Sequence, residues 1–331
     1  MTSGKQNSNL FDISLLRVFA TLSLVLWHSY CSYVCWGYGN SPLDQLYTKI
    51  ALVFIPDANM PLFTIISGFL FGYLLKKGKY TEFVPFLKNK TKRLFVPYLV
   101  LGFVINMLQI GRATPIDLLY GTPNHLWYCL MLFESFLVCW FVERKLSKYS
   151  VYINFILALL SFILVLNTGL GALRLKCIFG VGIAAYYYCY FYFGLFIERH
   201  KFFLLIYFKY LLPIVIILIA IQLKYQYVLF FSCISYFLLC FYIANLKGVE
   251  NFMRRTCQSV LEIIDKCSFG IYVFHQWIIW NITRSEWSHV YIQEHYILFP
   301  IILFFSVTLI SLALTRLSLK TRVGKFLLGG G

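Results

Sequence analysis

The chain has 331 residues, of which 60% are hydrophobic and 13% are charged, and its formal net charge is +16. A soluble domain carries about 25% charged residues, so this composition excludes an ordinary soluble enzyme and predicts side chains that face lipid. The basic residues occupy short gaps between apolar runs, which is typical of membrane topology and argues against a nucleic-acid partner. The ten cysteines lie mostly within apolar runs and lack metal-ligand spacing, so we expect no metal.

Apolar runs long enough to cross a hydrocarbon core of roughly 30 Å predict about ten membrane-spanning helices. In chain order they cover residues 15–35, 52–75, 94–110, 126–142, 151–168, 177–197, 202–221, 226–245, 268–282 and 297–315. No sequence repeat or long linker separates these runs. We therefore predict one all-α, polytopic membrane domain over residues 1–331, with its membrane region at about 15–315.

The distribution of Lys and Arg predicts the orientation. If the N-terminus is cytoplasmic, all but six of the 29 basic residues fall in cytoplasmic gaps. The six that fall on the other side are Lys49, Arg112, Arg174, Lys176, Lys224 and Arg284. Cytoplasmic loops of membrane proteins carry an excess of Lys and Arg, so this count favours ten spans with both termini cytoplasmic.

Two ionisable residues lie in the first predicted helix, where such side chains are costly and are functional candidates. Arg17 and His28 are eleven residues apart, almost three helical turns, so they share one face, and His28 lies roughly 16 Å further along, near mid-bilayer. A neutral imidazole suits a general base for a hydroxyl, and an arginine suits a phosphate or a carboxylate. The alternative interpretation is a histidine hydrogen-bonded between helices and an interfacial arginine.

Five stretches of the chain follow the order of motifs in a known family. They are the segment from Arg17 to His28, Phe63-Thr-Ile-Ile-Ser-Gly-Phe-Leu70, Lys90-Thr-Lys-Arg-Leu-Phe-Val-Pro-Tyr98, His125-Leu-Trp-Tyr128 and Ser268-Phe-Gly-Ile-Tyr-Val-Phe-His-Gln276. Together, over about residues 10–315, they resemble the acyltransferase-3 family of bacterial integral-membrane proteins, whose first helix carries an Arg or Lys, ten intervening residues and a His. Many members carry an acidic residue shortly before this arginine; this chain has Ser14 there, and Asp12 further back.

The resemblance implies an O-acyltransferase of the bacterial inner membrane that takes a short acyl group, most simply acetyl, from acyl-coenzyme A. It implies His28 as the general base and Arg17 as its catalytic companion. The acceptor would be a hydroxyl of an envelope carbohydrate, such as a polysaccharide or a lipid-linked sugar. The oligomeric state, the sugar and the acyl chain are left open.

Four further residues are candidates for binding the acyl donor. Lys90 and Arg93 lie in a basic gap that could hold the phosphates of acyl-coenzyme A, although topology and anionic lipid headgroups also explain such a cluster. Tyr272 and His275 belong to the late motif. His275 could line the cavity of His28 or bind the donor, or it could simply hydrogen-bond Tyr272 one turn away.

Three residues of the fourth predicted helix are weaker candidates. Glu134 is the only acid well inside a predicted span, and we interpret it as a possible partner of His28 or Arg17. His125 and Trp127, at the outer end of this helix, could stack on the acceptor sugar, although an interfacial aromatic belt explains them as well. The Ser67-Gly68 pair predicts close packing of two helices instead of a nucleophile.

A transporter or flippase that moves an acyl donor or a lipid-linked saccharide is the main alternative, because intramembrane His, Arg and Glu also suit a proton-coupled carrier. Such carriers often contain inverted repeats, and the sequence has none that we detect. A scaffold with a degenerate site is a third possibility. Turnover of labelled acyl-coenzyme A distinguishes all three.

Overall fold

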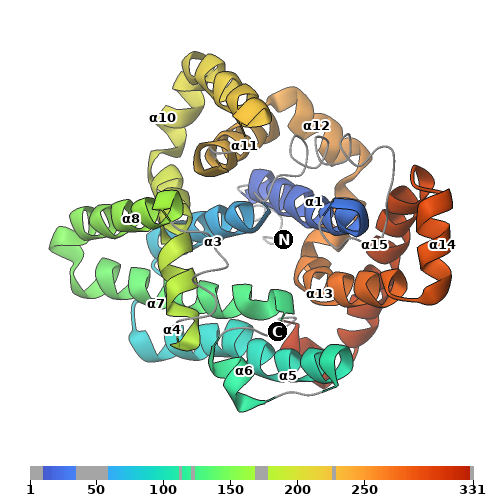
Figure 1. The fold of residues 1–331 in the computed structure, drawn as a ribbon. Helices are drawn as coiled ribbons and strands as arrows, with labels where there is room; N and C mark the ends of the chain where they lie inside the picture. Colours follow the sequence, from blue (N-terminus) through green and yellow to red (C-terminus); the bar gives the residue numbers. More distant parts are fainter. Residues whose placement is uncertain are drawn as a thin grey trace, which may run out of the picture. The chain divides into compact units, whose positions relative to one another are not determined.

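The structure is a computed structural model that describes residues 10–34, 59–111, 114–120, 124–167, 178–225 and 229–328. All regular secondary structure within these ranges is helical, which confirms the all-α prediction (Figure 1). The helices are α1 (Phe11–Val34), α3 (Asn59–Lys76), α4 (Phe83–Lys90), η2 (Thr91–Phe95), α5 (Val96–Ile110), α6 (Pro115–Leu119), η3 (Asn124–Leu126), α7 (Trp127–Lys145), η4 (Ser147–Tyr149), α8 (Ser150–Asn167), η5 (Ile178–Gly180), α10 (Val181–Tyr225), α11 (Leu229–Ala244), α12 (Lys247–Thr256), α13 (Gln258–Thr283), α14 (Glu286–Glu294), α15 (Leu298–Ser318) and α16 (Arg322–Leu327).

The described part of each predicted span falls on a helix, whereas residues 52–58 and 226–228 of two predicted spans lie outside the described residues. Within the described residues, six helices are long and apolar enough to cross a membrane, or seven if the bent pair α11 and α12 forms one span. The predicted segments 177–197 and 202–221 fall largely on one helix, α10, whose 45 residues correspond to about 68 Å along the helix axis, roughly twice the thickness of a hydrocarbon core. The count of about ten and the cytoplasmic termini therefore stay predictions.

The basic entry to the third predicted span is helical. The chain is helical from Phe83 through α4, the π-helical turn η2 and α5. The backbone N–H of Val96 donates to the oxygen of Thr91, five residues back. Pro97 has no N–H, and its ring would clash with the carbonyl four residues earlier, which explains why the turn before it is widened.

The chain divides into two compact units. Unit 1 comprises Met1–Leu62 and Leu205–Leu317, and unit 2 comprises Phe63–Leu204 and Ser318–Gly331. The boundary between Leu204 and Leu205 falls inside α10, so each unit holds part of that helix. This division does not test the prediction of a single membrane domain, and each unit is described by itself below.

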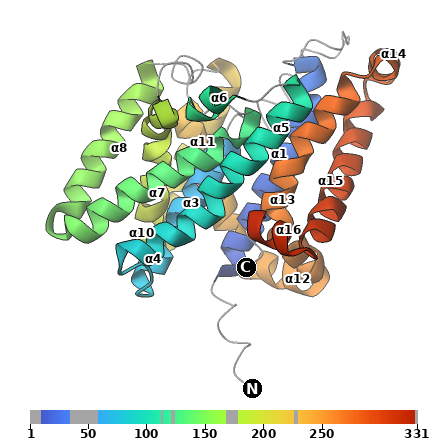
Figure 2. The ribbon, with the colours of Figure 1, turned by 90° about the horizontal axis from the view of Figure 1, so that it is seen from below.

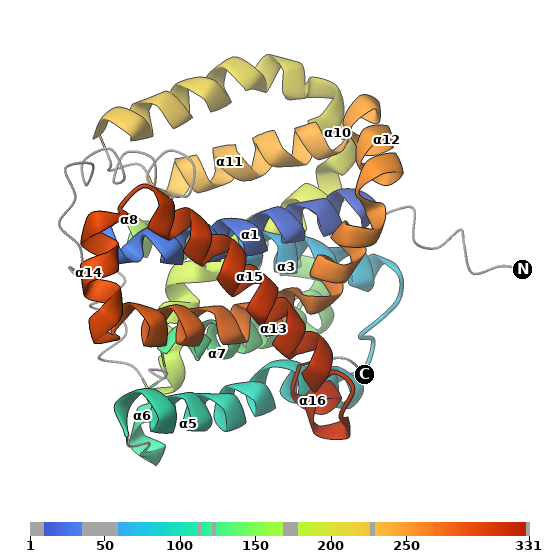
Figure 3. The ribbon, with the colours of Figure 1, turned by 90° about the vertical axis from the view of Figure 1, so that its right-hand side faces the viewer.

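In unit 1, α1 packs between α11 and α13 (Figure 3). The amide of Asn245, just after α11, donates to the Asp12 carboxylate near the start of α1. At the other end of α1, the Tyr33 hydroxyl donates to the backbone oxygen of Ile292 in α14. α11 thus ends where α1 begins, and α1 ends beside the connection that follows α13. α1 and α11 therefore run in opposite directions, and α1 and α13 run in the same direction. The predicted alternation of spans requires these same directions.

In unit 2, α7 runs antiparallel to the continuous stretch α4–η2–α5 (Figure 2). Trp140 stacks on Phe86 with ring centroids 5.4 Å apart, whereas Phe133 lies 5.3 Å from Phe95. As the residue number rises along α4–η2–α5, the number of the contacting residue in α7 falls. This agrees with consecutive spans that cross in opposite directions.

The part of α3 in unit 2 crosses α10 at two glycines. A Cβ atom on Gly68 would overlap the backbone oxygen of Phe191, and a Cβ atom on Gly194 would overlap the backbone oxygen of Ile65. Small residues let two helix backbones approach this closely in a membrane protein. The predicted packing role of the Ser67-Gly68 pair is thus confirmed for Gly68.

Candidate active site

Two pairs of polar side chains join α1 to α13 within unit 1. Near the start of both helices, Nε of Arg17 lies 2.8 Å from Oδ1 of Asp265. Further along, Nδ1 of His28 lies 3.3 Å from Nε2 of His275. The paired residues are eleven positions apart on α1 and ten apart on α13. The two helices therefore run parallel and in step over roughly 16 Å.

The partners of the two imidazoles determine where their protons lie. Nδ1 of His275 lies 2.7 Å from the backbone oxygen of Tyr272 and 3.0 Å from that of Ile271. Carbonyl oxygens only accept, so this nitrogen carries the hydrogen and the neutral ring keeps Nε2 as an acceptor. Nδ1 of His28 lies 3.0 Å from the oxygen of Leu24 and faces the His275 acceptor, so it also carries a hydrogen. The basic nitrogen of neutral His28 is therefore Nε2.

The two histidines differ in burial. His275 is fully buried with 0% of its surface exposed, whereas His28 is only partly covered. Their rings meet edge to face, with centroids 4.9 Å apart and an angle of 69° between the planes. The buried His275 accepts a hydrogen bond from Nδ1 of His28 and so orients the partly accessible His28 ring. A general base and the group that orients it are arranged in this way.

Arg17 is bound to an acidic partner that the sequence reasoning did not identify. Asp265 lies on α13, ahead of the predicted span 268–282, and also hydrogen-bonds to Ser14 one turn before Arg17. Burial raises the pKa of the Asp265 carboxyl, and the Arg17 guanidinium opposes that shift. Asp265 lies ten residues before His275, and Arg17 lies eleven residues before His28. This similar spacing is the sequence signal from which the pairing of Arg17 with Asp265 could have been predicted.

Comparison with known proteins gives one result that covers nearly the whole chain. A family model described as an acyltransferase domain, that of the acyltransferase-3 family, matches residues 10–316. The chain belongs to this family. Searches among curated proteins and among solved structures give no match. Together with its long apolar helices, family membership makes the protein a multi-pass membrane acyltransferase.

Two of the motifs that suggested this family meet in the acyltransferase. The segment from Arg17 to His28 lies on α1, and the segment from Ser268 to Gln276 lies on α13. Tyr272 is buried beside His275, with ring centroids 6.1 Å apart, and its backbone oxygen accepts from that histidine. Unit 1 therefore brings together Arg17, His28, Tyr272 and His275. Their roles in catalysis and donor binding stay predictions.

Lys90 and Arg93 belong to unit 2 and differ in their surroundings. The Lys90 ammonium lies 3.3 Å from the ring centroid of Phe136, 5.1 Å from that of Tyr80 and 5.9 Å from that of Phe71. Lys90 is buried, and cation–π contacts with desolvated rings are worth about 2 kcal/mol. Arg93 is exposed and lies in η2, a π-helical turn of the kind often found at functional sites. Of the two predicted donor ligands, Arg93 is the accessible one.

His125 and Trp127 are buried in unit 2 instead of being presented at a surface. Trp127 packs against Tyr187, with ring centroids 5.5 Å apart. Since Phe133 lies opposite Phe95, the start of α7 lies opposite about residue 101, in the middle of α5. Their burial favours packing, while their place at the outer membrane boundary and a role in acceptor binding stay predictions.

Glu134 also belongs to unit 2, whereas its predicted partners His28 and Arg17 belong to unit 1. Its Oε2 atom is buried and makes no hydrogen bond within the described residues. It lines a mostly apolar cavity of about 510 Å³ together with Ser135 and Tyr188. The pairing of Glu134 with either partner stays a prediction.

The Arg17–Asp265 pair gives a first testable prediction. Replacing Arg17 by Gln or Asp265 by Asn is expected to lower the thermal unfolding midpoint of the purified protein, because each change leaves a partly buried charge without its partner. The side chains are 33% and 17% exposed, so solvent screens the pair, and we expect a coupling energy of about 1 kcal/mol in a double-mutant cycle. Additive effects of the two single changes would show that the ion pair contributes nothing.

Proposed function

We propose that this acyltransferase transfers a short acyl group, acetyl in the simplest case, from acyl-coenzyme A to a hydroxyl of an envelope carbohydrate or lipid-linked sugar. The proposal places the protein in a bacterial inner membrane with both termini cytoplasmic. The observation that carries it is the partly accessible His28, whose Nδ1 is held by Leu24 and His275 and whose Nε2 is therefore the basic nitrogen. An imidazole in this tautomer suits the deprotonation of an alcohol.

The proposed reaction is a direct transfer. Nε2 of His28 takes the proton of the acceptor hydroxyl as its oxygen attacks the carbonyl carbon of the thioester. The carbon–sulfur bond breaks, and the coenzyme A thiolate leaves and takes up the proton from His28. The positive charge that forms on His28 is stabilised by the Leu24 oxygen and by Nε2 of His275, both of which accept from its Nδ1–H.

The donor is proposed to reach the site from the basic, cytoplasmic side, and the acceptor from the opposite side. Arg17 is partly exposed in unit 1 and Arg93 is exposed in unit 2, whereas Lys90 is enclosed by aromatic rings. The ion pair with Asp265 fixes the Arg17 guanidinium before any ligand binds. A preorganised arginine loses less side-chain entropy on binding an anionic donor.

Turnover tests the proposal directly. The purified protein is incubated with labelled acetyl-coenzyme A and an extract of lipid-linked saccharides, and free coenzyme A and acetylated product are quantified by mass spectrometry. We expect both products to accumulate in a protein-dependent manner. An intact thioester, with label carried across the membrane of a proteoliposome, would identify a carrier instead of an enzyme. Mass spectrometry of envelope material from cells with and without the protein then identifies the acceptor.

A further inference from the structure

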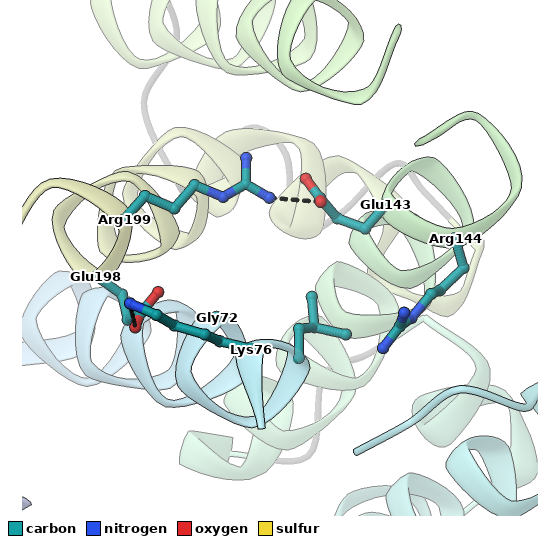
Figure 4. Close-up of a pocket in the computed structure, with 7 residues that line it drawn as sticks. Gly72, Lys76, Glu143, Arg144, Glu198 and Arg199 are labelled. Atoms are coloured by element: carbon teal, nitrogen blue, oxygen red, sulfur yellow. Dashed lines mark hydrogen bonds and ion pairs between the residues drawn. The ribbon is translucent and has the colours of Figure 1, made fainter. Parts of the chain in front are cut away.

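Unit 2 contains a charged cavity that the proposed reaction does not use (Figure 4). Its volume is about 370 Å³, and its charged lining consists of Lys76, Glu143, Arg144, Glu198 and Arg199. These residues come from the last turn of α3, the last turn of α7 and the middle of α10. All three places lie in gaps that the distribution of Lys and Arg assigns to the cytoplasmic side. The fold thus gathers three predicted cytoplasmic boundaries around one cavity.

Two of the cations in this cavity are held by carboxylates to different degrees. Arg199 lies 2.5 Å from Glu143, a carboxylate that also accepts from the Asn154 amide at 2.6 Å. This pair is tightly fixed, because the Asn154 amide oxygen in turn accepts from Tyr188. Lys76 lies 3.5 Å from Glu198, and its side chain is 69% exposed. Such a long, exposed pair contributes little and leaves the ammonium available to another anion.

Arg144 is the third cation, and no carboxylate pairs with it within the described residues. Its Nη2 donates to the backbone oxygen of Lys79 at 3.0 Å, and its Nε is buried without a hydrogen-bond partner among the described residues. In Figure 4 its guanidinium lies at the end of the cavity opposite to the ammonium of Lys76, which extends to Glu198. Three cations and two carboxylates leave the cavity with one excess positive charge. A buried guanidinium N–H that lacks an acceptor is a costly arrangement that an anionic ligand would relieve.

We propose that this cavity is a binding site for a phosphate group, with Arg144 as its principal ligand and Lys76 as a second cation at the other end of the cavity. A phosphate offers several acceptor oxygens and matches the planar fork of an arginine better than a single carbonyl does. The cavity is large enough for one phosphate-bearing headgroup or for the phosphorylated end of a nucleotide. The nucleotide end of acyl-coenzyme A is one source, and this assignment rests on the proposed function. The phosphate of an anionic lipid is the other source.

Binding measurements on the purified full-length protein in detergent test the site. Coenzyme A and coenzyme A without its 3′-phosphate are titrated against wild type, Arg144→Gln, Lys76→Gln and the control Lys145→Gln. Lys145 is the exposed neighbour of Arg144 on α7 and does not line the cavity. If the nucleotide occupies the site, Arg144→Gln is expected to weaken coenzyme A binding about tenfold, since charge-assisted hydrogen bonds contribute roughly 1.5–3 kcal/mol. Lys145→Gln is expected to have no effect.

A second arm identifies a lipid source. Thermal unfolding midpoints are measured in nanodiscs of phosphatidylcholine with and without phosphatidylglycerol. Stabilisation by phosphatidylglycerol that Arg144→Gln and Lys76→Gln remove, with coenzyme A affinity unchanged, assigns the site to lipid phosphate. Equal coenzyme A affinity and equal lipid stabilisation in all variants would overturn the inference. Lys76→Gln, at an exposed position, keeps the test valid if Arg144→Gln does not fold.

The same variants separate this inference from the proposed function. Turnover that depends on His28 but not on Arg144 or Lys76, together with unchanged binding in both arms, would refute the phosphate site and leave the acyltransferase mechanism intact. Binding that depends on Arg144, in a protein that releases no coenzyme A from acetyl-coenzyme A, would support the site and refute the proposed donor chemistry.

Discussion

Replacing His28 by glutamine is expected to reduce acyl transfer by about 10²–10⁴-fold, the range that a general base contributes. Glutamine keeps a polar side chain at the same place on α1 but has no nitrogen that takes up a proton. The loss is expected in kcat, because the proton is transferred during the chemical step and not during donor binding. The measurement is the release of free coenzyme A from acetyl-coenzyme A by purified wild type and variant, with the thermal unfolding midpoint recorded for both.

The matched control is His295→Gln. His295 is also a histidine of unit 1, but it follows α14 and is exposed. This variant is expected to retain wild-type turnover. A His28→Gln protein that folds and turns over at the wild-type rate would refute the assignment of His28 as the base.

Variants of His275 examine how His28 is oriented. The buried Nε2 of His275 accepts from the Nδ1–H of His28, so a side chain that still accepts is expected to preserve part of the activity. His275→Gln, whose amide oxygen accepts a hydrogen bond, is expected to retain more kcat than His275→Leu, which offers no acceptor. Equal kcat in both variants, with equal unfolding midpoints, would mean that His275 only fills space.

The helices of unit 1 show how much of this fold was predictable from sequence. Hydropathy placed spans at 15–35, 226–245 and 268–282; the structure has α1 and α11 over nearly the same residues as the first two, and α13 ends with the third but begins ten residues earlier, at Gln258. The contact between Asp12 and Asn245 and the two pairs between α1 and α13 agree with the directions that the positive-inside count predicts. These features depend on local composition, and composition is readable in a single sequence.

The prediction missed helices that continue through charged residues, because charge marks a membrane boundary while the same residue types favour helix formation. The charged stretch from Glu198 to Lys201 was interpreted as a break between two spans, yet α10 continues through it. Glu, Arg and Lys are good helix formers, so charge marks a membrane boundary without ending a helix. The same reasoning explains why α4 and η2 are helical through the basic residues before Pro97.

The candidate site was predictable only in part, because its contacts join residues far apart in the chain. His28 and Arg17 could be selected because ionisable side chains are costly inside a membrane and because they match the family motif. Neither observation identifies the residues that pair with them. Asp265 lies outside the motif and 248 positions from Arg17, and hydropathy alone carries no signal for such a pairing. Likewise, nothing in the sequence around Lys90 indicates the ring of Phe136 that lies over its ammonium.

Replacing Gly194 by alanine is expected to lower the free energy of unfolding strongly, although it adds only one methyl group. The added Cβ would overlap the backbone oxygen of Ile65, and the backbone N of Phe69 would lie 2.8 Å away. A side chain in the way can rotate, but a helix backbone cannot, so α3 and α10 must separate along their contact. Overpacking usually costs 1–3 kcal/mol, and we expect a loss of about 3 kcal/mol or more here. The measurement is the thermal unfolding midpoint in detergent, with Gly68→Ala as the reciprocal variant, because its Cβ would overlap the Phe191 oxygen.

The matched control is Gly248→Ala in α12, where an added Cβ meets no atom within 4 Å. Alanine is the better helix former by about 1 kcal/mol, so this change is expected to leave stability unchanged or slightly raised. The contrast between the two positions isolates the helix crossing from the general cost of losing a glycine. If Gly194→Ala unfolds at the same temperature as Gly248→Ala, the two helices do not approach each other closely at Gly68 and Gly194. The packing role assigned to these glycines would then be wrong, because a crossing with room for a methyl group does not need them.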